Sequence, residues 1–188
     1  LLDGSNKIKE YVRRVKELGM DSAAITDHGV MYGVIDFYKA CRAEGIRPIL
    51  GCEVYVAPNS RFDKELTGGD DRYYHLVLLA ENNTGYNNLT RIVSRGFTEG
   101  YYYKPRVDME LLQEFHEGII ALSACLAGEV QRYITKGLYD EAKKTALKYQ
   151  ACFGKGNYFL ELQDHGIPEQ RTVNMELLQM SRELDIPL

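Results

Sequence analysis

No apolar run in the 188-residue sequence approaches the roughly 20 residues that a membrane span requires. The first residues also lack the charged and apolar regions of a secretory signal. The four cysteines are scattered without the Cys-x-x-Cys spacing of a zinc ribbon, and no disulfide framework is indicated. These absences predict a soluble chain with free thiols that remains inside the cell and has no membrane partner.

A surplus of basic residues is absent as well. The formal net charge is -4, with 27 acidic residues against 23 lysines and arginines. Proteins that bind nucleic acid through a broad surface carry a basic patch, so any DNA contact here should be local or made by another part of a larger protein. What the chain does have is a 45% hydrophobic composition, enough for one globular domain with its own core.

Hydrophobic periodicity predicts helices and strands in alternation along the chain. Helices are expected near residues 8–18, 32–44, 86–95, 109–116, 129–135, 140–149 and 169–184. Strands are expected at 22–26, 49–56, 74–80, 119–122 and 158–162, with a polar loop at 58–71 and the start of a further strand at 186–188. Because near-continuous apolar strands are buried on both faces, this order predicts a parallel α/β sheet covered by helices, either open or closed into a barrel.

Polar side chains stand beside these expected strands, where both architectures place their functional residues. They are Asp27 and His28 after the first strand, Glu53 in the second, His75 in the third, Cys125 after the fourth, and Asp164 and His165 after the fifth. Imidazole and thiolate groups suit zinc, and carboxylates can bridge two ions or accept a proton from bound water. The set predicts a divalent metal site.

Each of these residues also has a structural interpretation. A histidine in a buried strand, such as His75, is more often hydrogen-bonded in the core than bound to a metal. The Asp27 segment could form only a turn, Cys125 could be a small buried hydrophobe, and the Asp-His pair after the fifth strand could cap a loop. Glu53 favours a functional role most strongly, because burying an unpaired carboxylate is unfavourable.

Residues 100–106 combine three consecutive tyrosines with two cationic side chains. Tyr101, Lys104 and Arg106 could stack on bases and contact the phosphates of a nucleic acid. Packing of this loop against neighbouring helices explains the pattern equally well.

Six segments, in order along the whole chain, form a specific pattern: 1–4, 24–29, 48–55, 75–80, 122–129 and 158–166. Together they resemble successive motifs of the PHP (polymerase and histidinol phosphatase) domain of bacterial DNA polymerase III alpha subunits. The resemblance implies a distorted, seven-stranded β/α barrel that holds two to three zinc or manganese ions at its C-terminal face. It further implies phosphodiester hydrolysis, in the form of a 3′→5′ exonuclease, within a replicative polymerase.

The resemblance also assigns roles to individual residues. It makes metal ligands of five residues: His28, Glu53, His75, Cys125 and Asp3. It gives roles in orienting ligands or water to three others: Asp27, Asp164 and His165. Glu53 would bridge two ions and, with His28, would take part in catalysis.

Two motifs of the family do not occur in residues 1–188: the His-x-His pair of its first strand and the Asp-x-His motif of its last. We therefore expect a single PHP domain without those two strands, part of a longer polymerase chain and inactive as an isolated fragment. The resemblance places polymerisation (nucleotidyl transfer), with its magnesium, in a later domain of the parent chain. It implies DNA, a proofreading subunit and a sliding clamp as partners, in the bacterial cytoplasm.

Two other functions remain open from the sequence. The domain could be a structural module that stabilises the polymerase or docks a proofreading subunit without catalysis. It could also be a stand-alone phosphatase that acts on a small phosphate ester.

Overall fold

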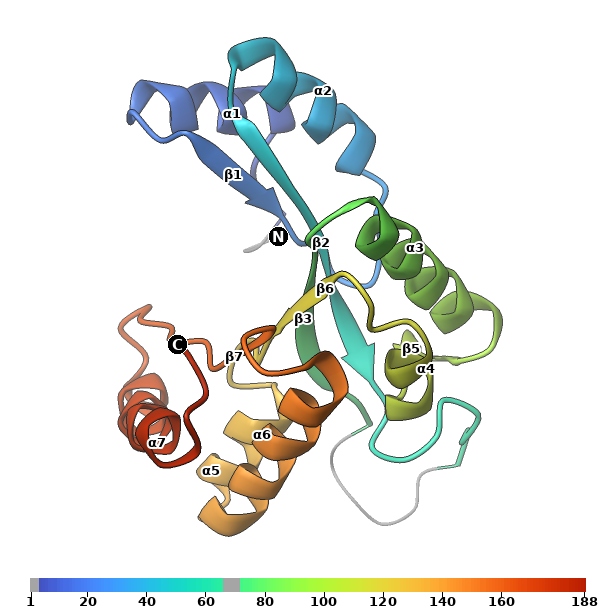
Figure 1. The fold of residues 1–188 in the computed structure, drawn as a ribbon, viewed down its shortest axis with the longest axis vertical. Helices are drawn as coiled ribbons and strands as arrows, with labels where there is room; N and C mark the ends of the chain where they lie inside the picture. The colour runs from blue at the N-terminus through green and yellow to red at the C-terminus, as the bar shows by residue number, and fades with distance from the viewer. Residues whose placement is uncertain (1–3, 66–71) are drawn as a thin grey trace.

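The computed structural model describes residues 4–65 and 72–188, which form a mixed sheet with helices packed around it (Figure 1). The helices are α1 (Ile8–Glu17), α2 (Val34–Glu44), α3 (Asn83–Thr98), α4 (Met109–Glu114), α5 (Glu129–Thr135), α6 (Tyr139–Phe153) and α7 (Pro168–Leu184). The strands are β1 (Ser22–Ile25), β2 (Arg47–Val56), β3 (Tyr74–Ala80), β4 (Tyr101–Tyr102), β5 (Lys104–Val107), β6 (Ile119–Leu122) and β7 (Tyr158–Phe159). The expected helices and the first four expected strands are confirmed, with bounds that differ by a few residues.

Three details differ from the expectation. The fifth expected strand is shorter, because β7 ends at Phe159. Residues 186–188 form no strand, although the Leu160 amide donates to the carbonyl of Pro187 (2.9 Å). β4 and β5, which the sequence pattern did not predict, pair as a short antiparallel hairpin.

β2 is the centre of a mixed sheet, which has seven strands within the described residues. β1 and β5 are parallel to β2, and β7 is parallel to β6, but β3 is antiparallel to both β2 and β6. The prediction of an all-parallel sheet is therefore wrong for β3. A parallel neighbour needs a crossover connection, usually a helix, whereas the described part of the link between β2 and β3 contains none.

The sheet is open within the described residues, since its pairing order ends at β4 and β7, which do not pair with each other, and β1 pairs with β2 off this order. β1 covers only the first half of β2, from Arg47 to Leu50. β3 covers the second half, from Gly51 to Val56. The C-terminal half of β2 is therefore the place where the segments after β1, before β3 and after β6 can meet.

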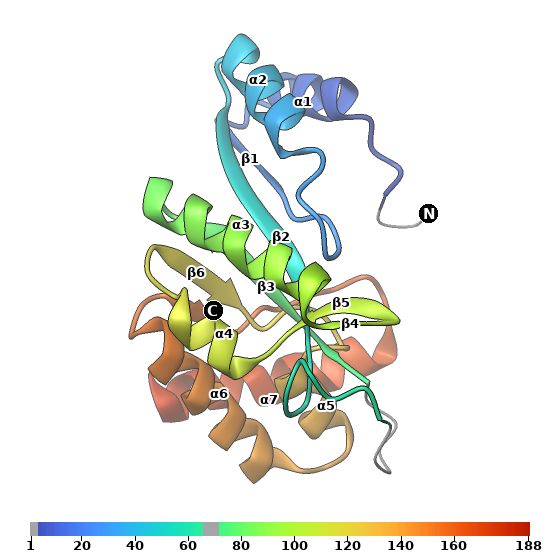
Figure 2. The ribbon, with the colours of Figure 1, turned by 90° about the vertical axis from the view of Figure 1, so that its right-hand side faces the viewer.

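Two hydrophobic cores lie along β2. The smaller one joins α1, α2 and β1 through six buried residues: Val12, Val15, Ala23, Phe37, Cys41 and Ile46. The larger one packs β2, β3 and β6 against α3, α5, α6 and α7. Figures 1 and 2 show α1, β1 and α2 as a lobe at one end of β2, with α5, α6 and α7 toward the other. None of the described helices is both long and apolar enough to cross a bilayer.

Candidate metal centre

His28 lies beside Glu53 because the parallel pairing of β1 and β2 resumes just past the end of β1. The Glu53 amide donates to the carbonyl of Asp27 (3.0 Å), and the Gly29 amide donates to the carbonyl of Glu53 (2.9 Å). These bonds make His28 and Glu53 a parallel bridge pair. The imidazole Nδ1 of His28 is consequently 3.6 Å from the Glu53 carboxylate.

His75 reaches the same carboxylate from the start of β3. In the antiparallel register His75 is opposite Tyr55, and Glu53 is the next residue on that face of β2. The Nδ1 atom of His75 is 2.6 Å from Glu53 Oε1. On its other side His75 forms a parallel bridge with Gly128, and its amide donates to the Ala127 carbonyl (3.0 Å).

Cys125 joins this group from the loop that follows β6. Ala124, just before it, has a φ of 64°, a left-handed conformation that costs about 1–2 kcal/mol for a residue with a Cβ atom. The Ala127 amide donates to the Cys125 sulfur (3.4 Å). That sulfur lies 3.6 Å from Nδ1 of His75 and 3.9 Å from Oε1 of Glu53. The left-handed backbone at Ala124 thus directly precedes the Cys125 thiol, which points toward the Glu53 carboxylate.

The donor atoms of His28, Glu53 and His75 all lie within 4.8 Å of one another. Two imidazoles and a carboxylate, with a thiol beside them, are donors that zinc and related divalent ions prefer. Ligands about 2.1 Å from a shared tetrahedral ion are roughly 3.4 Å apart, so only the 2.6 Å pair of His75 and Glu53 would have to separate. The residues therefore fit a divalent metal ion.

Access to the centre is uneven. The side chains of Glu53 and His75 are 15% and 17% exposed, whereas that of His28 is 37% exposed. The centre is therefore most accessible on the side of His28.

The proton on His75 is the main electrostatic feature of the centre. Burial lowers the pKa of His75, but hydrogen bonds and electrostatic interactions with Cys125 and Glu53 outweigh burial and raise this pKa to about 9. Without an ion, His75 is therefore an imidazolium at neutral pH, paired with Glu53. An ion that used the same nitrogen would displace this proton.

Cys52, next to Glu53 in the sequence, has a different environment. Its side chain points to the opposite face of β2, and its thiol donates to the carbonyl of Asp27 (3.3 Å). Burial, with a smaller contribution from the charges of Asp27 and Glu53, raises its pKa to about 12. Cys52 is therefore a protonated core residue.

The structure separates the remaining predicted residues from this group. Asp27 contributes its main chain to the centre, while its carboxylate lies toward Gly33. Asp164 accepts the amide of Gly166 (3.1 Å), and His165 is hydrogen-bonded through Nδ1 to the Gln170 amide (3.0 Å). These bonds cap the loop before α7, the structural alternative for this pair. Asp3 lies outside the described residues.

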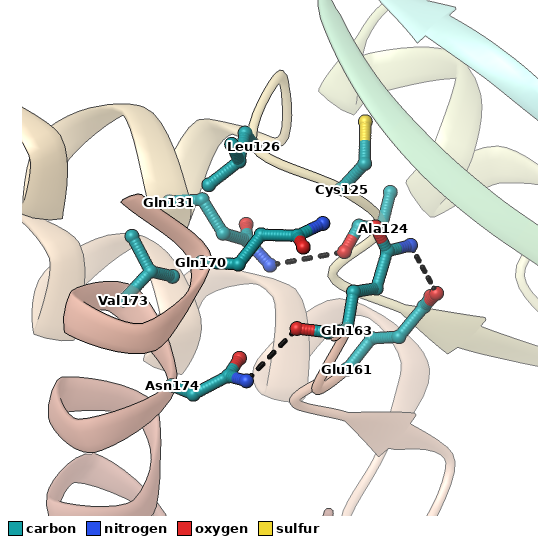
Figure 3. A pocket seen from close by; sticks show the side chains of 9 residues that line it. All are labelled: Ala124, Cys125, Leu126, Gln131, Glu161, Gln163, Gln170, Val173 and Asn174. Carbon is teal, nitrogen blue, oxygen red and sulfur yellow. Dashed lines mark hydrogen bonds between the residues drawn. The ribbon is translucent and has the colours of Figure 1, made fainter. Parts of the chain in front are cut away.

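Glu161, to which sequence reasoning gave no role, lies near the centre. Burial raises its pKa and the charge of Glu53 raises it further, while the amides of Gln163 and Ala124 act in the opposite direction. Figure 3 shows the bond from Gln163 to Glu161 (2.7 Å) in a pocket that Cys125 also lines. Glu161 comes directly after a strand, as His28 does, and this position is the sequence signal that could have identified it.

The tyrosine-rich segment forms the β4–β5 hairpin. Tyr101 is 56% exposed, and Lys104 is exposed with its Nζ 5.4 Å from the centre of the Tyr55 ring. Arg106, in contrast, is 4% exposed, and its guanidinium donates to the carbonyls of Gly100, Arg61 and Asp63. Arg106 packs the loop from inside, so the expected contact with nucleic acid does not extend to it.

Comparison with known proteins identifies the class. Residues 1–165 match the sequence model of the PHP domain, and the chain belongs to this family. Its relatives include DNA polymerase III subunit alpha of Treponema pallidum (50% identical) and of Borreliella burgdorferi (43% identical). Both alignments cover all of this chain but only 16% of the relative. The resemblance inferred from the motifs is thereby confirmed, and the chain spans about one sixth of the length of these relatives.

Solved structures show the same fold at low sequence identity. A protein described as a metal-dependent phosphoesterase from Bifidobacterium adolescentis matches with a TM-score of 0.57 and 16% identity, over 98% of this chain and 80% of that one. An amidohydrolase from Chromobacterium violaceum, with bound sulfate and no metal, matches with a TM-score of 0.57 and 13% identity, over 97% and 80% of the two chains. The expected PHP-type fold is confirmed.

Proposed function

We propose that this chain is the PHP domain of a bacterial DNA polymerase III alpha subunit and contributes to a metal centre that hydrolyses phosphodiester bonds at the 3′ end of DNA. The observation that supports this is the convergence of three side chains from separate segments, His28, His75 and Cys125, onto one carboxylate oxygen of Glu53. A domain that served only to brace the polymerase would have no need to gather metal-binding side chains at one point.

Each candidate ligand would have a distinct part in such a centre. A bound zinc or manganese ion would lower the pKa of a water molecule and offset charge on the phosphate oxygens. Glu53 supplies the carboxylate oxygen that the other three side chains approach. Its main chain is hydrogen-bonded to the turn that carries His28, which holds the two residues together. His75 and Cys125 close the buried side, and His28 leaves the exposed side for the phosphate.

The remaining assignments are proposals that concern the parent chain. We infer that it acts in the bacterial cytoplasm on DNA, together with a proofreading subunit and a sliding clamp, and that its magnesium-dependent polymerisation is carried out by another domain. The 188 residues form one domain of that chain.

The test uses the full-length parent protein. After chelation it is reloaded with zinc or manganese, its metal content is measured by mass spectrometry, and its degradation of a labelled single strand is followed. Glu53→Gln should lower both metal content and degradation while primer extension persists. Glu10→Gln is the matched control, because Glu10 is exposed on α1 and forms a surface ion pair with Lys7.

Degradation by Glu53→Gln at the rate of the unchanged protein would place the hydrolysis elsewhere. Metal binding without any degradation by the parent would favour the structural module over the exonuclease.

A further inference from the structure

The β4–β5 hairpin presents exposed aromatic rings. Tyr101 pairs with Pro105 and Tyr102 pairs with Lys104, which leaves Tyr103 alone at the turn. Tyr101 and Tyr103 are 56% and 60% exposed. Large aromatic side chains are usually buried to a greater extent, so two such rings on one short hairpin are a notable surface.

The backbone at Tyr103 is unusual as well. Its φ is 61°, in the left-handed region where glycine or asparagine is ordinarily found. Such a conformation in a bulky residue persists where its surroundings hold it, and it is more frequent at functional sites. The turn alone would favour glycine or asparagine, so an exposed tyrosine at this position suggests that its ring has a function.

The hairpin is fixed directly beside the metal centre. The ring of Tyr55, under Lys104, is centred 5.3 Å from the ring of His75 and 6.4 Å from that of His28. A Cβ atom on Gly29 would lie 2.8 Å from the Tyr55 ring and 3.1 Å from Pro105. The close packing around Gly29 thus ties the hairpin to the turn that carries His28.

Two cations remain available on this surface. The guanidinium of Arg72 lies over the Tyr103 ring at 4.5 Å, and Lys104 lies over Tyr55. Within the described residues neither forms an ion pair with a carboxylate, although the chain as a whole is acidic. Lys64 is engaged differently, because its Nζ donates to the carbonyl of Tyr101 (2.8 Å) and braces the hairpin.

We propose that the tyrosine hairpin, defined as Tyr101, Tyr103 and Lys104 together with Arg72, binds the single-stranded DNA whose end reaches the metal centre. Unpaired bases stack on aromatic faces without regard to sequence, and nearby cations contact the phosphates. Exposed rings suit a single strand, since bases in a duplex are already stacked. This inference rests on the proposed function and adds the substrate subsite to it. The sequence predicted a nucleic-acid contact for Arg106, and here Tyr103 and Arg72 make that contact instead.

The first experiment measures contact and does not depend on hydrolysis. The full-length parent is irradiated with a single strand that carries 5-iodouracil, and the crosslinked peptides are mapped. We expect crosslinks in the peptide with Tyr101 and Tyr103, besides those in the polymerase domain, and we expect Tyr103→Leu to reduce them. Crosslinks elsewhere on the protein with none at the hairpin would overturn the proposal.

The second experiment measures the use of the subsite. Tyr103→Leu should raise KM for degradation of a single strand about tenfold and leave kcat within about twofold, because base stacking is lost and the metal centre is intact. Hydrolysis of a small diester, thymidine 5′-p-nitrophenyl phosphate, should not change. Tyr38→Leu, a change of an exposed tyrosine on α2, is the matched control and should leave KM unaltered.

The outcomes separate the two proposals. If the unchanged parent hydrolyses neither substrate but crosslinks at the hairpin, the hydrolytic function fails and the DNA subsite stands. If Tyr103→Leu weakens binding of a protein subunit while crosslinking and KM are unchanged, the hairpin is a protein contact and the DNA subsite is refuted.

Discussion

Replacing Arg61 by methionine tests the buried ion pair that supports the tyrosine hairpin. The side chains of Arg61 and Asp108 are 3% and 2% exposed, and Nη1 of Arg61 lies 2.8 Å from Oδ1 of Asp108. The Arg61 carbonyl also accepts from the guanidinium of Arg106 in β5. Methionine retains an unbranched stem but leaves the Asp108 carboxylate buried without its cation, a change that costs about 3–5 kcal/mol.

Hydrogen exchange in the full-length protein would measure this loss locally. Asp108 caps α4 by accepting the Leu111 amide (3.0 Å), so the amides of α4 and β5 should exchange roughly 150-fold to several thousandfold faster. Arg95→Met is the matched control: Arg95 pairs with Glu99, as Arg61 does, but its side chain is 30% exposed. The stability lost in Arg95→Met should therefore stay below about 1 kcal/mol.

A double variant completes the test of this reasoning. Arg61→Met with Asp108→Asn should recover most of the lost protection, because asparagine still caps α4 and no charge remains buried. If Arg61→Met exchanges no faster than Arg95→Met, or if the double variant is no better than the single one, the buried pair does not carry the stability assigned to it.

Three further predictions concern the centre and its loop. Cys125→Ser should reduce retention of zinc more than of manganese in dialysis, since thiolate prefers softer ions. Gly128→Ala should lower thermal stability by a few degrees or more, because its Cβ would lie 2.1 Å from the Ser123 carbonyl oxygen. In the metal-free protein the contribution of His75 to stability should be complete below pH about 6.5 and disappear as the pH rises through about 9. An ordinary pKa for His75 in an NMR titration would contradict this, and Glu53→Gln should lower that pKa.

The direction of β3 shows both what the sequence could predict and where it misled. Alternating helices and strands suggested a parallel sheet, in which the start of a strand lies far from the C-terminal end of its neighbour. His75 is at the start of β3, so a parallel β3 would have placed it away from Glu53. Because β3 is antiparallel, its first residues meet the end of β2 instead. The polar segment between these strands, in place of a helix, was the available clue.

The hairpin could not have been predicted by the same means. β4 and β5 contain two and four residues, which is too short for periodicity to be measured. The turn at Tyr103 also lacks the glycine or asparagine that normally marks a hairpin. The burial of Arg106 depends on carbonyls from residues more than 40 positions away in the chain, at Arg61 and Asp63. Only tertiary structure distinguishes this arginine from the exposed Lys104 two residues earlier.

The candidate ligands are positioned by the backbone of the sheet, and this links metal binding to folding. His28 and Glu53 are a bridge pair, His75 is bridged to Gly128, and the pairing of β2 with β3 sets the distance between Glu53 and His75. A slip of one residue between β2 and β3 would turn His75 to the opposite face and dismantle the group. An ion that binds only the correct register would stabilise it over the slipped one, to an extent set by its concentration relative to Kd. Metal should therefore protect the amides of β2 and β3 from exchange more than those of α1 and α2, which belong to the separate small core.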